Sequence, residues 1–136
     1  MAANTAPIYT ATAAASWANL AAANTAKDGT GTVATIFTAD ATNGSYVERV
    51  VVRPLGSVVA TAVRIFVNNG STNTTATNNS LIAELTLAST TNSEVAAIAG
   101  IEFQLRIALP AGYKLLATLG TWSTGSVQLT ALGGNY

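Results

Sequence analysis

Residues 100–109 read GIEFQLRIAL, and this stretch decides the fold class. Apolar side chains alternate along it with polar or small ones, so that the two kinds fall on opposite sides of an extended chain. Side chains of a β-strand point to its two faces in turn, whereas helical spacing would scatter the apolar residues around the axis. The segment therefore predicts a strand with one face in a core. The apolar positions are Ile101, Phe103, Leu105, Ile107 and Leu109.

Further segments of the chain repeat this alternation, and turn residues separate them. Asn43-Gly44, Asn69-Gly70 and Pro110-Ala111-Gly112 supply residues that take positive φ or end a strand. We therefore expect an all-β protein, an antiparallel β-sandwich or jelly-roll-like fold of about seven to eight strands. The other strand segments are Val33–Thr38, Tyr46–Arg53, Ala62–Asn68, Leu81–Leu87, Tyr113–Leu119 and Val127–Ala131.

The first 24 residues lack a clear period and are rich in Ala, Thr and Asn. Alanine favours helix, but Thr, Asn and Ser interrupt it. We expect an extended N-terminal arm at residues 1–24, followed by a single β-sandwich domain at residues 25–136. Two interpretations are open: the arm packs along its own sandwich, or it reaches a neighbouring subunit. Tyr9 and Trp17 are the aromatic side chains that would anchor it.

Composition excludes several classes of function. The chain has a formal net charge of zero, 9% charged residues, and neither histidine nor cysteine. Nucleic-acid binding needs clustered Lys and Arg, and thiolate or imidazole catalysis needs the two missing residue types. No apolar run approaches the ~20 residues that span a bilayer. We expect no enzyme, no cofactor, no metal, no nucleic acid and no membrane segment, and a surface either polar without charge or covered by partners.

Two carboxylates are the remaining candidates for chemistry. Glu84 and Glu102 could in principle form the acid pair of a glycosidase. Both fall on the polar faces of predicted strands, where we expect them to be solvated and to face Arg64 and Arg106 across the sheet.

The predicted strand at residues 46–53 carries charges on an otherwise apolar side. Simple alternation puts Arg49 and Arg53 on the side of Val47 and Val51. Such charges indicate a subunit interface, or equally the protection of a sheet edge.

Several turns and strand ends along the chain form a recognisable set of sequence motifs. It comprises Ala23–Gly31 continuing through Val33–Thr38, Arg64–Gly70, Asn79–Glu84, Leu109–Tyr113 and Gly133–Tyr136. These stretches resemble a family of small virion-associated proteins of tailed bacteriophages. The resemblance covers the chain from about Asn24 to Tyr136 and contains no active-site signature.

The resemblance implies a capsid decoration, or cement, protein. Such proteins are commonly β-rich trimers on the outer head shell at local threefold positions. We therefore expect a homotrimer that binds the major capsid protein, assembles in the host cytoplasm and resides on the virion surface. Tyr9, Trp17, Arg49 and Arg53 are the candidate contacts with the capsid or with neighbouring protomers.

Two other functions are compatible with the sequence. The first is a head-fibre or tail-associated module that recognises a host surface glycan through the loop Asn68–Ser80 or through exposed aromatics. The aromatic candidates are Trp17, Tyr46, Tyr113 and Trp122. The second is a minor tail or baseplate component with the same fold.

Overall fold

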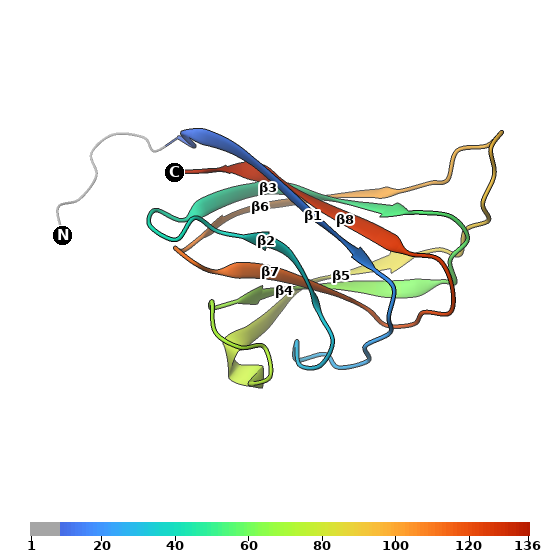
Figure 1. The fold of residues 1–136 in the computed structure, drawn as a ribbon, viewed down its shortest axis with the longest axis horizontal. Helices are drawn as coiled ribbons and strands as arrows, with labels where there is room; N and C mark the ends of the chain where they lie inside the picture. The colour runs from blue at the N-terminus through green and yellow to red at the C-terminus, as the bar shows by residue number, and fades with distance from the viewer. Residues whose placement is uncertain (1–8) are drawn as a thin grey trace.

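The computed structural model describes residues 9–136 and is a sandwich of two four-stranded antiparallel sheets (Figure 1). The first sheet has the order β1-β8-β3-β6, and the second has the order β2-β7-β4-β5. A single 3₁₀ turn, η1 (Ala76–Asn78), precedes β5 in the described part of the chain. The strands are β1 (Thr12–Leu20), β2 (Ala34–Thr38), β3 (Ser45–Pro54), β4 (Thr61–Asn68), β5 (Asn79–Leu87), β6 (Ile101–Leu109), β7 (Lys114–Leu119) and β8 (Val127–Asn135).

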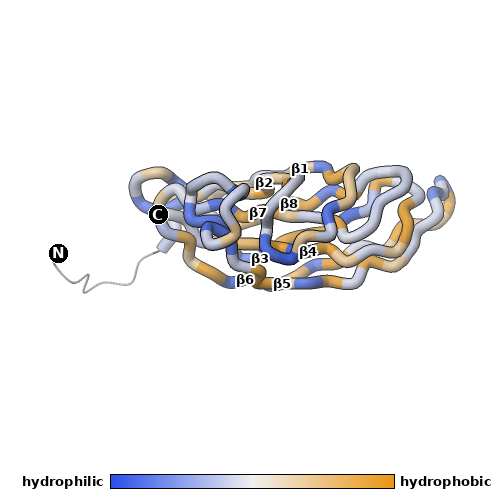
Figure 2. The backbone as a smooth tube through the Cα atoms, turned by 90° about the horizontal axis from the view of Figure 1, so that it is seen from below, coloured by the Kyte–Doolittle hydropathy of each residue, from blue (hydrophilic) through white to orange (hydrophobic). Residues whose placement is uncertain are grey.

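This strand order is that of a jelly roll, an eight-stranded sandwich built from two Greek keys. The all-β prediction and the sandwich are thus confirmed. Strands β1 and β2 lie along one long side of the sandwich, and β5 and β6 lie along the opposite side (Figure 2). Each of these four strands is an edge of its sheet.

The core lies between the sheets and takes alternate residues from the strands. Val47, Val50 and Val52 of β3 are fully buried there, as are Val63 and Ile65 of β4. Burial of these side chains supplies most of the driving force for folding, and no disulfide adds to it.

A β-bulge in β3 corrects one prediction from the sequence. The pairing of β3 with both neighbours shifts between Val47 and Arg49. The extra residue restarts the alternation, so Val47 enters the core while Arg49, Val51 and Arg53 face outward. Val47 therefore does not share a face with the two arginines.

The outer face of the second sheet is buried in the middle. Phe66 of β4 and Leu116 of β7 face each other on the side away from the core, and both are buried. Two loops, residues 21–33 and 69–78, reach this face: Leu116 shares a hollow with Val33 of the first loop and with Ser71, Thr72 and Asn73 of the second. Asn73 of the second loop donates Nδ2 hydrogen bonds of 3.0 and 2.9 Å to the carbonyls of Gly29 and Gly31 in the first loop. The asparagines of the predicted exposed loop therefore join the loops together.

The described part of the predicted N-terminal arm contributes a strand to the sandwich. All nine residues of β1 pair with β8, from Thr12 opposite Asn135 to Leu20 opposite Val127. The sandwich thus includes a strand that precedes residue 25. Residues 1–8 of the predicted arm lie outside the described residues.

Candidate functional site

The outer face of the first sheet brings three of the predicted contact residues together. Trp17 of β1 lies opposite Thr130 of β8, which lies opposite Val51 of β3. Arg49 and Arg53 flank Val51 at two residues on either side, on the same face. Because neighbouring strands are about 4.8 Å apart, Trp17 is about 10 Å from the row of β3 side chains. Trp17 is 63% exposed, which is unusual for an indole in a sheet.

Tyr9, the fourth predicted contact, lies at one end of this face. It lines a hollow together with Thr10, Tyr46 and Tyr136. The Tyr46 hydroxyl donates a hydrogen bond of 3.0 Å to the Glu48 carboxylate. That hydrogen bond is the main reason why the pKa of Tyr46 is raised, because it stabilises the protonated phenol.

Most of the charged side chains on this face form ion pairs. Arg49 contacts Glu102 at 3.0 Å, and Arg106 contacts Glu48 at 3.3 Å. The predicted pairing of Glu102 with Arg106 is therefore wrong. The reason is that Glu102 and Arg106 both lie on β6, four residues apart, so each pairs instead with a residue of the neighbouring strand β3. Arg106 lies at the bulge, with a positive φ of 51°. Arg53 forms no ion pair with any described carboxylate.

The predicted pairing of Glu84 with Arg64 is confirmed, but its setting differs from the expectation. The two side chains approach to 3.7 Å, and Arg64 is buried under the loop at residues 21–33. Its Nη1 donates a hydrogen bond of 3.4 Å to the carbonyl of Asn24. Arg64 therefore belongs to the buried contact between the second sheet and its covering loop and is not a solvated charge.

A second candidate surface, which sequence reasoning missed, lies at one end of the sandwich. We call it the three-loop end, because it is formed by residues 55–60, 88–100 and 120–126. Thr90 holds the first two loops together: its backbone pairs with Val58, and its hydroxyl donates a 2.7 Å hydrogen bond to the Gly56 carbonyl. Thr121 joins the third loop through a 2.7 Å hydrogen bond from its hydroxyl to the Ala60 carbonyl.

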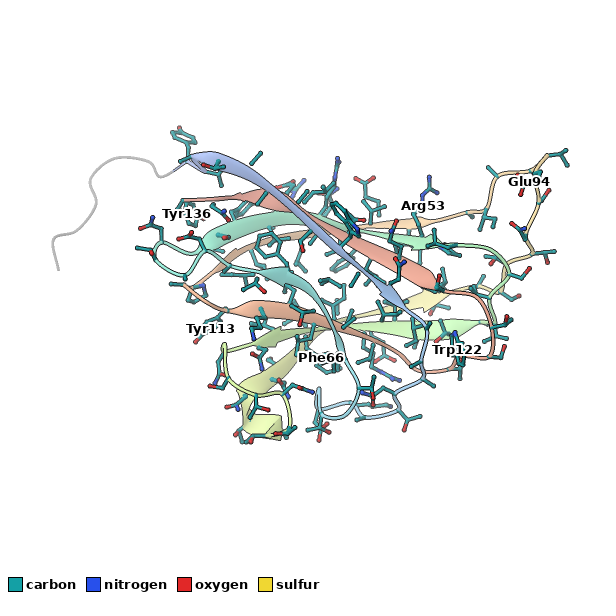
Figure 3. All side chains as sticks on the ribbon, viewed as in Figure 1. Arg53, Phe66, Glu94, Tyr113, Trp122 and Tyr136 are labelled. Atoms are coloured by element: carbon teal, nitrogen blue, oxygen red, sulfur yellow. The ribbon has the colours of Figure 1, made fainter. Side chains whose placement is uncertain are left out.

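The three-loop end carries large apolar side chains in solvent. Val95 is 98% exposed, near the tip of a loop that extends far from the body of the sandwich, beside Glu94 (Figures 1 and 3). Trp122 lies at the same end, and its indole nitrogen donates a 2.9 Å hydrogen bond to the Gly125 carbonyl, which fixes the ring. Leu55 and Val59 are also exposed there. The sequence contains one signal for this surface: an apolar run follows Glu94 in a segment that lacks strand alternation.

Most of the described acidic side chains lie in turns or in ion pairs. No group of three or more His, Cys, Asp or Glu residues gathers among them to hold a metal ion. Hydrogen bonds from Thr30 lower the pKa of Asp28, and backbone N–H groups of Asn43 and Thr42 lower that of Asp40, so both remain ionised acceptors in turns. In the part of the chain that is described, no helix has the length and apolarity needed to cross a bilayer.

Comparison with known proteins finds no family model, curated protein or solved structure that matches this chain.

Proposed function

We propose that the protein is a structural component of a bacteriophage virion, a capsid decoration protein that binds the outer head shell and stabilises it. The observation that carries the proposal is the three-loop end, where hydrogen-bonded loops hold large apolar side chains in water. The resemblance of the chain to small virion proteins, given above, supplies the class of partner.

The three-loop end has the physical properties of a docking surface. Exposed apolar side chains on a soluble domain indicate a contact, and anchors that are already rigid lose little conformational entropy on binding. Trp122 is held by its own hydrogen bond to Gly125, and Val95 projects beyond the sandwich. Full burial of a valine side chain contributes about 1.5–3 kcal/mol. A few such anchors are sufficient when the contact repeats over a shell.

The expected effect on the shell follows from linkage. A protein that binds the assembled shell and not its dispersed subunits adds its binding free energy to the stability of the shell. The chain needs no reactive group for this work. The major capsid protein and further copies of this chain, as a homotrimer, are the partners that belong to the proposal, with Trp17, Arg49 and Arg53 on a face open to them.

A sedimentation assay with purified head shells tests the proposal. We expect the wild-type protein to co-sediment with the shells and the variants Val95→Asp and Trp122→Ala to lose at least tenfold in affinity. Ile82→Asp is the matched control, because Ile82 is an exposed apolar residue on β5, away from the three-loop end. Equal binding by all variants would remove the three-loop end from the contact, and no binding by the wild type would refute the function.

One observation favours a second candidate, recognition of a surface glycan. Tyr9, Tyr46 and Tyr136 line one hollow with Thr10. Aromatic rings beside hydroxyl groups suit the apolar and polar faces of a sugar ring. A glycan array probed with the wild type and with Tyr9→Ala decides this candidate: a sugar signal that Tyr9→Ala abolishes supports it, and a blank array excludes it.

A further inference from the structure

The free edge of β1 differs from the other sheet edges of the sandwich. Strands β2, β5 and β6 each have a shifted register where a residue is inserted. Strand β6 also carries charges and a residue at positive φ, Arg106. Bulges and charges of this kind prevent a sheet edge from pairing with another chain. Three of the four edges are therefore protected.

Strand β1 has none of these protections. It runs nine residues in continuous register with β8, and its sequence TAAASWANL contains no charge and no proline. Leu20 is its only buried residue. Among the described residues, the backbone of Thr12–Leu20 pairs with β8 alone. A long, uncharged edge strand without a bulge presents unpaired N–H and C=O groups to a further strand.

We propose that β1 pairs antiparallel with β1 of a second copy of this chain, about a two-fold axis at Ser16. This register overlaps all nine residues, with Thr12 opposite Leu20 of the second copy and Ser16 opposite its equivalent. The two first sheets then join into one continuous sheet.

The side chains of β1 are complementary to themselves in this register. Trp17 faces Ala15 of the second copy, so each large indole lies beside a methyl group on the outer face. Ala14 faces Ala18 on the inner face. The strand is uncharged, so no like charges meet across the axis. Pairing would also cover part of Trp17, which is 63% exposed.

The contact is isologous and separate from the three-loop end. It does not depend on the proposed function, and it predicts a solution mass that is an even multiple of the 13.7 kDa chain. The homotrimer of the proposed function needs a different interface, and trimers joined in pairs through β1 would form a hexamer, which is also an even multiple.

Sedimentation velocity on the wild type and two lysine variants tests the pairing. We expect Ala15→Lys to halve the mass of the wild-type particle, because the lysines of the two copies would lie diagonally across the axis, about 7–8 Å apart, and repel each other. Ala108→Lys is the matched control, since Ala108 is an exposed alanine on the same outer face but on β6. A wild-type monomer or trimer, or an Ala15→Lys variant of unchanged mass, overturns the proposal.

A cysteine cross-link tests the register, because the chain has no cysteine of its own. Residues facing each other across an antiparallel pair have Cα atoms about 4.5–5.5 Å apart, within disulfide range. We expect Ser16→Cys to form a linked dimer on mild oxidation. Asn19→Cys places its two sulfurs on residues about 20 Å apart and should not. Equal linkage by both variants, or by neither, contradicts the register. The Ala15→Lys variant is also tested for binding to head shells. If it binds them as the wild type does, the pairing of β1 and the shell contact are independent of each other.

Discussion

Truncation of Phe66 to alanine tests whether the loops truly cover the second sheet. Phe66 has 0% exposure although it points away from the main core, so it is buried only if the loops at residues 21–33 and 69–78 seal the outer face. Phe66→Ala removes a fully buried ring and leaves a cavity, which costs about 3–5 kcal/mol. A domain of this kind is stable by about 5–15 kcal/mol, so the loss is a large share of the total.

Urea denaturation followed by circular dichroism measures this loss. For an m-value of about 2 kcal/mol/M, the midpoint should fall by about 2 M. Val95→Ala is the control: it also shortens an apolar side chain, but Val95 is 98% exposed, and the free energy of unfolding should change by no more than about 0.5 kcal/mol. If Phe66→Ala cost as little as Val95→Ala, the loops would not cover the sheet in solution.

Two further predictions concern close packing and pH. A Cβ at Gly133 would collide with the Tyr46 carbonyl oxygen across the β3–β8 pair, so Gly133→Ala should destabilise by about 1–3 kcal/mol; an unchanged melting temperature in calorimetry would contradict the packing. Hydrogen bonds hold the pKa values of Asp28 and Asp40 below the usual 3.8 in the folded state. Their contribution to stability is present above pH 3.8 and is lost as the pH falls through the lower folded values. Because the chain has no histidine, the free energy of unfolding measured in urea titrations should stay flat from about pH 5 to 8; a steep change there would count against this assignment.

The sequence predicted the strands whose one face is buried, because period-two alternation records that burial directly. Segment 100–109 is the clearest case, and β6 occupies all of it but the first residue. Strand β1 gave no such signal. Its inward residues Ala14, Ser16 and Ala18 are small and only partly covered, so apolar and polar positions do not contrast. Its position is fixed by pairing with β8, a contact distant in sequence.

The candidate site was predicted only in part, for two physical reasons. A bulge in β3 adds a residue that reverses the alternation, which is why Val47 was placed on the wrong face while Arg49 and Arg53 were on one face as expected. The three-loop end depends on loops that meet through hydrogen bonds such as that from Thr90 to the Gly56 carbonyl. No pattern within a short stretch of sequence predicts that these loops contact each other. Exposed Val95 is recognisable as a contact only once its surroundings are known.

The location of the protein in virus particles tests the proposed function most directly. A cryo-electron microscopy map of virions that contain this chain should show the eight-stranded sandwich on the outside of the head, with the loop carrying Val95 directed at the shell. Density for the sandwich on the tail or baseplate, or the absence of such density from the outside of the head, would contradict the account.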